Sequence, residues 1–333
     1  AIDSPVLAPG ASAEATLDGW QDPDEPDGER WLAVTFETAH DETWAPKGTS
    51  ICWDQVPLAA PPVPAPPLAS QGQVELDREG NLQHPALVSP PALCLTRALI
   101  DNERVSWIGQ ARSGQGLDDP QPGPATIEHD EGATRITREV RFGTSIVRHT
   151  QVLTPFGNGG VHVAEEAEIP AGLTDPPRVG TVLELAPGLV DAEWFGLGPH
   201  ECYPDRLRSG LVGRWRSPID ALFVPYIRPQ EAGGRAQVRW LELTDGAGDG
   251  ARLTMERPMQ VSANRFTASE LDVATHLEDL QPRPTTVVHL DAAHRGVGTA
   301  ACGPDTLPEY LLGPGLYRWA WSIEAVRGSG RRD

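Results

Sequence analysis

The chain has 333 residues, more than one hydrophobic core usually organises, so its length predicts two domains. Its 33 prolines and 34 glycines are too many for a mostly helical protein and indicate short strands joined by many turns. The formal net charge of −20 leaves no basic surface that could displace counterions from phosphate. Nucleic acid and anionic membranes are therefore excluded as partners, and no apolar run reaches the roughly 18 residues of a membrane-spanning helix.

The first part of the chain predicts a small β domain over residues 1–58. Leu32, Val34 and Phe36 alternate with polar residues and predict one face of a strand, and residues 51–58 predict its closing strand. Residues 59–70 contain five prolines and cannot join the interior of a sheet, so they predict a stiff linker.

The second domain is expected over residues 71–326, followed by a disordered tail at 327–333. Five segments alternate between apolar and polar residues, as strands with one buried face do. The side chains expected to be buried are Ile136, Val140 and Phe142; Ile146 and Val152; Val161, Val163, Ala167 and Ile169; Val179, Leu183 and Leu185; and Tyr317, Trp319, Trp321 and Ile323.

One helix is expected over residues 267–280. Thr267 and Glu270 have the spacing of a capping box, and Leu271, Ala274 and Leu277 follow at helical spacing. Because strands do not alternate regularly with helices, a parallel α/β fold is excluded and the predicted class is all-β.

The four cysteines are far apart and lack the spacing of a zinc site or a redox pair. We therefore expect free thiols, which suit a reducing cytoplasm, and no metal site in this chain.

Residues 193–206, EWFGLGPHECYPDR, concentrate side chains that could line a sugar pocket. His200 could act as a base and Glu201 as an acid beside the aromatic Tyr203. The same segment also contains residues that shape and brace a tight turn, so both a functional and a structural role stay open. The turn residues are Gly198, Pro199, Asp205 and Arg206.

Two further regions could carry chemistry. Residues 294–305 follow a strand and contain His294 and Cys302, but no Lys-Ser/Thr follows the glycines, which excludes a phosphate loop. Around Trp107 we expect a glycine-containing loop, either a mobile element that closes over a ligand or an ordinary surface loop.

Four segments give the sequence a specific resemblance. WFGLGPHECYPDR, SPIDALFVPYIRPQEAGGR and HRGVGTAACGPD, preceded by TRALIDNE at 96–103, resemble in order and spacing the C-terminal part of the large bacterial β-galactosidases of glycoside hydrolase family 2. The resemblance implies an immunoglobulin-like β sandwich, of which residues 1–58 need not be the whole, and then a large antiparallel supersandwich of the galactose mutarotase-like type.

The resemblance also implies how such a chain would work. In that family the catalytic glutamates, Mg²⁺ and Na⁺ belong to an upstream (β/α)8 barrel, so we expect no catalytic residue, no cofactor and no hydrolysis by this fragment alone. The C-terminal domain forms one wall of the galactoside pocket, where some members have Trp at the position of Cys302. Asn102 and Trp107 are the other expected wall residues.

The family context further implies a homo-oligomeric cytoplasmic enzyme that includes the catalytic barrel. Two other functions remain open from the sequence. The first is an aldose 1-epimerase-like enzyme that uses His200, Glu201 or His294, and the second is a carbohydrate-binding or assembly module.

Overall fold

The computed structural model describes residues 6–16, 19, 28–59, 67, 70, 72–157 and 159–328. The chain divides into two compact units, residues 1–62 and 63–333, and each is considered by itself. Most of the predicted linker at 59–70 and of the predicted tail at 327–333 lies outside the described residues.

The first unit contains an antiparallel pair of strands, β1 (Arg30–Glu37) and β2 (Ser50–Ala59). Leu32 lies opposite Val56 across the pair, and Val34 and Phe36 follow on the same face. Val34 is 36% exposed and Phe36 52% exposed, so this face is not covered by the described residues. Both strands agree with the sequence analysis, but the described part of this unit is a two-stranded sheet rather than a sandwich.

The regular structure of the second unit is mostly antiparallel strands, which confirms the predicted all-β class and the large antiparallel supersandwich. Its strands are β3 (Leu87–Cys94), β4 (Gln121–Pro122), β5 (Thr126–Asp130), β6 (Ala133–Phe142), β7 (Ser145–Phe156), β8 (Gly160–Ile169), β9 (Arg178–Leu185), β10 (Asp191–Gly198), β11 (Leu211–Pro218), β12 (Arg235–Thr244), β13 (Gly250–Asn264), β14 (Thr286–His294) and β15 (Gly315–Val326).

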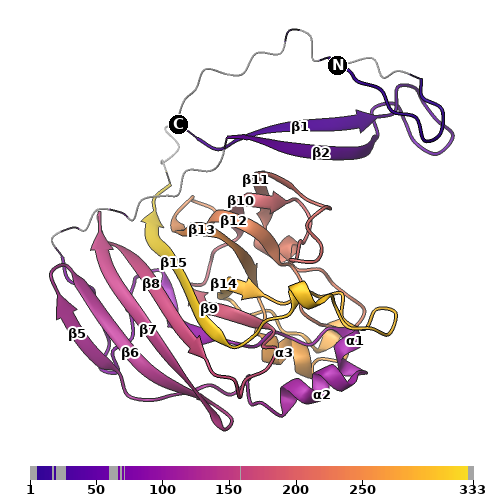
Figure 1. Ribbon diagram of the computed structural model, residues 1–333. Helices are drawn as coiled ribbons and strands as arrows, with labels where there is room; N and C mark the ends of the chain where they lie inside the picture. Colours follow the sequence, from indigo (N-terminus) through magenta and orange to yellow (C-terminus); the bar gives the residue numbers. More distant parts are fainter. Residues whose placement is uncertain are drawn as a thin grey trace. The chain divides into compact units, whose positions relative to one another are not determined.

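The long strand β13 organises this sheet, because it pairs with β12 on one side and with two different strands on the other. Its first half pairs with β15, which continues through β8, β7 and β6, and its second half pairs with β14, which continues through β9 and β3. Figure 1 shows β5, β6, β7, β8 and β15 side by side as one layer. The buried apolar side chains of the two branches form one contiguous core.

Most of the predicted buried faces are confirmed: Ile136, Phe142, Val163 and Trp321 are at most 1% exposed. The prediction for β7 is wrong, because Ile146 is 49% exposed. The buried face of β7 carries Val147, His149, Gln151 and Leu153. Because two of these side chains are polar, the alternation of apolar residues predicted that the opposite face of β7 would be buried.

The helical segments are short and gather at one end of the second unit (Figure 1). They are α1 (Asp101–Arg104), α2 (Trp107–Ser113) and α3 (Ala268–Val273), with the 3₁₀ turns η1 (Ile219–Leu222), η2 (Leu277–Asp279) and η3 (Pro308–Tyr310). Thr267 and Glu270 form the predicted capping box at the start of α3.

Two sequence-based expectations about helices are wrong. The helix from Thr267 ends at Val273, because the Asp279 side chain accepts hydrogen bonds from the amides of Thr275 and His276 and begins a separate turn. The expected loop around Trp107 is helical and forms α1 and α2.

Candidate functional site

The four segments that carry the resemblance meet at one pocket of about 190 Å³. We call them motif 1 (residues 96–103), motif 2 (193–206), motif 3 (217–235) and motif 4 (294–305), and the cavity the motif pocket. Motif 1 contributes Ile100, Asp101 and Asn102; motif 2 contributes Glu201, Tyr203 and Arg206; motif 3 contributes Tyr226, Gln230 and Glu231; and motif 4 contributes Val297. Residues as far apart in the sequence as Ile100 and Val297 thus form a common wall.

Motif 1 is held in place by Glu103, whose side chain is fully buried. Its carboxylate lies 2.9 Å from Arg97 and 2.7 Å from Arg112, and it accepts a hydrogen bond from the Ile100 amide at 3.2 Å. Burial opposes ionisation, but the two guanidinium groups hold the pKa of Glu103 below its ordinary value. The ion cluster fixes the first turn of α1, which brings Asn102 to the motif pocket.

Trp107 stands at the first position of α2 and is 71% exposed. Gly109, two residues further on, is required for packing, since a Cβ there would lie 2.4 Å from the Glu103 carbonyl oxygen. Trp107 is not among the residues that line the motif pocket, so its part in a pocket wall stays a prediction.

In motif 2, Glu201 is buried whereas its neighbour His200 is exposed. The Glu201 carboxylate accepts hydrogen bonds from Arg206 Nη1 at 3.0 Å, from the Gly233 amide at 2.9 Å and from the Tyr226 hydroxyl. The donors Tyr226 and Gly233 connect motif 2 to motif 3. Glu201 therefore has a structural role, because it holds these two segments together. A cis peptide joins Gly198 to Pro199, and a Cβ on Gly198 would lie 2.6 Å from the Trp215 ring.

His294 packs against Tyr203, which lines the motif pocket, with ring centroids 5.4 Å apart. The Tyr203 hydroxyl accepts a hydrogen bond from the Gly234 amide at 3.2 Å. His294 Nδ1 lies 2.7 Å from the Arg295 carbonyl oxygen, which assigns the proton to Nδ1. Burial lowers the pKa of His294 to about 4, so the ring is neutral near pH 7.

A second group of buried charges adjoins His294. Arg178 lies 2.9 Å from Glu231 and 3.4 Å from Asp291, and all three side chains are almost fully buried. Burial raises the pKa of Asp291 to about 7, whereas Arg178, acting against burial, holds the pKa of Glu231 below its ordinary value. Glu231 is therefore the charged partner of Arg178 at neutral pH.

Asp205 connects motif 2 to the loop of motif 4. Its Oδ2 accepts a hydrogen bond from the Gly298 amide at 2.7 Å and from the Thr306 hydroxyl at 3.3 Å. Gly296 is needed beside it, since a Cβ there would lie 2.6 Å from Asp205 Oδ2. Asp205 thus fixes the base of the loop that carries Cys302.

The tip of that loop is open to solvent, and Cys302 is exposed. Arg295, with no exposed side-chain surface, anchors the loop from below through Asp175 at 2.8 Å and through Asp305. All four cysteines belong to the described residues, and all are free thiols, as expected. An exposed thiol on an anchored loop can contact a ligand but does not by itself give chemistry.

Sequence reasoning missed the buried charges that support the pocket: Arg97, Glu103, Arg178, Glu231, Asp291 and Arg295. Four of them belong to the motifs themselves, so their signal was present in the quoted segments. Arg178 and Asp291 lie on the strands β9 and β14. A charged residue within a mostly apolar strand could have indicated a buried ion pair at these positions.

Within the described ranges, no group of three or more His, Cys, Asp or Glu side chains is arranged to hold a metal ion. In the same part of the chain no helix is long and apolar enough to cross a membrane.

Comparison with known proteins gives the family. Residues 71–323 match the family model of the β-galactosidase small chain, and residues 1–59 match that of β-galactosidase domain 4. The chain is 32% identical to a β-galactosidase of Arthrobacter sp. strain B7 over 86% of its length, and 28% identical to β-galactosidase 2 of Enterobacter cloacae over 89%. It spans 32% of the length of each of these relatives.

Among solved structures, a putative aldose 1-epimerase from Escherichia coli K12 aligns with 61% of this chain and 68% of its own. Its identity is 13% and its TM-score 0.31, too low to support any inference. The match to the small-chain model over residues 71–323 carries the assignment: the chain belongs to the β-galactosidase small-chain family.

Proposed function

We propose that this chain is the non-catalytic C-terminal portion of a β-galactosidase and supplies one wall of its sugar pocket. The observation that carries the proposal is the convergence of four family motifs on the motif pocket. Its lining offers the amide of Asn102 and the hydroxyl of Tyr226, which are suited to hydrogen bonds with sugar hydroxyls.

The carboxylates at the pocket favour a supporting role. Retaining hydrolysis of a glycoside needs two carboxyl groups about 5 Å apart, one of them protonated and the other free to attack. Of the three carboxylates that line the motif pocket, Glu201 accepts hydrogen bonds from three donors and Glu231 is paired with Arg178, which leaves Asp101 without the second free carboxyl group that the reaction needs. We therefore propose that hydrolysis of terminal β-galactosides occurs in a separate catalytic barrel and that this chain alone is inactive.

The remaining features of the proposal follow from the family resemblance. Mg²⁺ and Na⁺ would bind in the catalytic domain, and the complete enzyme would be a cytoplasmic homo-oligomer. The free thiols are in keeping with a reducing compartment.

An aldose 1-epimerase activity is less well supported by the geometry. It would need an acid and a base that both reach one sugar, but His200 is exposed, Glu201 is held by Arg206, and His294 is buried and neutral. Polarimetry on fresh α-galactose with the purified chain tests this alternative, and faster mutarotation than in buffer would restore it.

The wall itself is tested in the enzyme that combines this chain with its catalytic domain. Cys302 is exposed and does not itself line the motif pocket, so the proposed contact needs a larger side chain at the loop tip. Cys302→Trp should change KM for 2-nitrophenyl β-galactoside by about threefold or more, because the large ring would contact the aglycone. Cys52→Trp, at an exposed thiol of the first unit, is the matched control and should leave KM unchanged. Equal KM values for all three proteins would reject the wall.

A further inference from the structure

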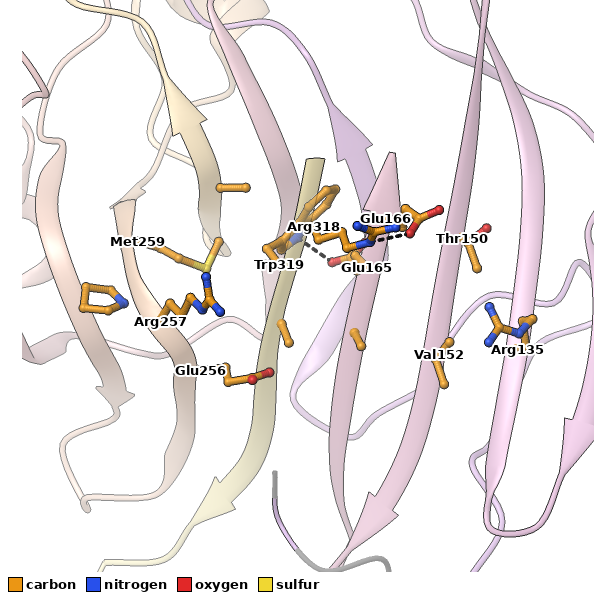
Figure 2. Close-up of a pocket in the computed structure, with 14 residues that line it drawn as sticks. Arg135, Thr150, Val152, Glu165, Glu166, Glu256, Arg257, Met259, Arg318 and Trp319 are labelled. Carbon is orange, nitrogen blue, oxygen red and sulfur yellow. Dashed lines mark hydrogen bonds and ion pairs between the residues drawn. The ribbon is translucent and has the colours of Figure 1, made fainter. Parts of the chain in front are cut away.

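A second hollow, much larger than the motif pocket, lies on the open face of the layer formed by β6, β7, β8 and β15. Its volume is about 670 Å³, within the range of about 300–1,000 Å³ typical of small-molecule sites. We call it the sheet groove. Figure 2 shows Glu256 and Arg257 on one side of it and Arg135 on the other.

The floor of the sheet groove is made of small side chains in register. Val152 on β7 lies opposite Ala164 on β8, and Ala164 lies opposite Ala320 on β15. Side chains at such paired positions project from the same face of a sheet, so three adjacent small residues leave a trough. With strands about 4.8 Å apart, the row from Arg135 to Ala320 spans about 14 Å, enough for more than one sugar ring.

The far wall arises from the branching of β13. Residues 250–255 of this strand pair with β15, and residues 260–264 pair with β14. Glu256 and Arg257 fall between the two pairings, where β13 leaves β15 and the sheet opens. The groove is therefore a consequence of the strand topology.

The groove walls carry both signs of charge. Arg318 is paired with Glu166 at 2.7 Å, whereas the side chains of Arg135 and Arg257 have no hydrogen-bond or ion-pair partner within the described part of the chain. Glu256 is 4.0 Å from His162. Guanidinium donors and carboxylate acceptors facing one trough match the hydroxyls of a neutral sugar, which both donate and accept. An anionic ligand would meet Glu166 and Glu256 on the open face, in a chain of net charge −20.

The floor is held rigid from the core side of the same strands. Glu165 of β8 accepts hydrogen bonds from His149 at 2.8 Å and Gln151 at 3.1 Å, both on β7. It also accepts a hydrogen bond from Trp319 at 3.0 Å (Figure 2). A further one comes from Trp321 at 2.7 Å, and both tryptophans are on β15. The three strands that form the floor are thereby joined through one carboxylate, so little ordering is needed when a ligand binds.

We propose that the sheet groove binds a neutral oligosaccharide of two or three rings. Hydroxyl groups would bond to Arg135, Arg257 and Glu256, and an apolar sugar face would rest on Val152, Ala164 and Ala320. This site is separate from the motif pocket and shares no lining residue with it. It therefore adds a carbohydrate-binding function beyond the proposed pocket wall.

The test is isothermal titration calorimetry of the 333-residue chain with 4′-galactosyllactose and, separately, with cellotriose. At least one probe should bind with a Kd of about 1 mM. Arg257→Ala should weaken binding about tenfold, because a charged hydrogen-bond donor is lost. Arg148→Ala is the matched control, since Arg148 is exposed on β7 and does not line the groove, and it should bind within about twofold of the wild type.

Ala164→Trp fills the floor and should abolish binding. Arg257 is exposed, so its replacement keeps the test decisive if the larger substitution disturbs folding. No heat with either trisaccharide, or a Kd that neither groove variant changes, would overturn the proposal. Binding lost in Asn102→Ala but kept in Arg257→Ala would move the ligand to the motif pocket. Since no step depends on turnover, these results are independent of the galactosidase proposal.

Discussion

Two carboxylates in the second unit are buried to a similar degree, but their pKa values are shifted in opposite directions. They are Glu165, which lies below the sheet groove, and Asp291, which lies behind the motif pocket. Each residue is at most 3% exposed. Burial acts against ionisation of both, yet the pKa of Glu165 lies below its ordinary value while that of Asp291 is raised to about 7. The depth of burial therefore does not decide the charge state.

The difference lies in the number of donors. Glu165 accepts hydrogen bonds from five side chains: His149, Gln151, Thr181, Trp319 and Trp321. Asp291 faces Arg178 at 3.4 Å, and its Oδ1 has no hydrogen-bond partner among the described residues. Hydrogen bonds to a carboxylate favour its charged form. At Asp291 the guanidinium of Arg178 is the main favourable charge, and burial together with the negative charge of Glu231 outweighs it. The cost of removing an acidic side chain should accordingly follow its number of donors.

The largest loss is expected for Glu165→Gln. The amide has one oxygen in place of two, and its NH₂ group faces donors, so several buried N–H and O–H groups lose their acceptor. The free energy of unfolding should fall by about 3–5 kcal/mol, measured by urea denaturation. Glu166→Gln is the control, because its partner Arg318 is 69% exposed, and it should cost less than about 1 kcal/mol. Equal losses of stability in the two variants would contradict the expectation that the cost follows the number of hydrogen-bond donors.

Asp205→Ala should have the next largest effect. It leaves the Gly298 amide and the Thr306 hydroxyl without their acceptor, which should lower the free energy of unfolding by about 1–3 kcal/mol. The Gly298 amide should also exchange its hydrogen faster, since the loop of Cys302 loses an anchor. Asp220→Ala, at a side chain 79% exposed, should change neither quantity. Unchanged exchange at Gly298 would show that Asp205 braces its own turn instead.

A smaller loss is expected for Arg206→Ala. Arg206 is one of three donors to Glu201, and its side chain is 48% exposed, so Tyr226 and Gly233 keep most of the carboxylate's hydrogen bonds. The expected loss is about 1 kcal/mol. In the enzyme that includes the catalytic domain, kcat should stay nearly constant. An unchanged melting temperature with a collapsed kcat would make Arg206 part of the substrate site.

The same contrast explains what the sequence could predict. Alternation located most strands and buried faces, because a half-buried strand repeats every two residues. It failed on β7, where His149 and Gln151 are buried as donors to Glu165. Their partner is on the next strand, so pattern reading along one segment could not find the pair.

The sequence could predict which segments form the candidate site, but it could not predict that they meet at one pocket. The quoted segments contained Asn102, Glu201, Tyr203 and Arg206, but their meeting at one pocket depends on strand pairings between distant parts of the chain. The sheet groove left no signal in the sequence, because its floor is a row of small residues contributed by three strands.

The smallest cost is expected for Asp291→Asn, and its sign should depend on pH. With a pKa of about 7 in the folded chain against an ordinary value of 3.8, Asp291 keeps a proton between these values that the unfolded chain has released. Its contribution to stability is complete below pH 3.8 and is lost as the pH rises towards 7. The asparagine variant lacks this loss, so its stability relative to the wild type should increase over that range and show no deficit at pH 7. His294, which titrates in the opposite direction, is common to both proteins and cancels in the difference. Urea denaturation of both proteins at several pH values measures this difference, and a variant that weakens relative to the wild type as the pH rises would mean that Asp291 is a charged partner of Arg178 after all.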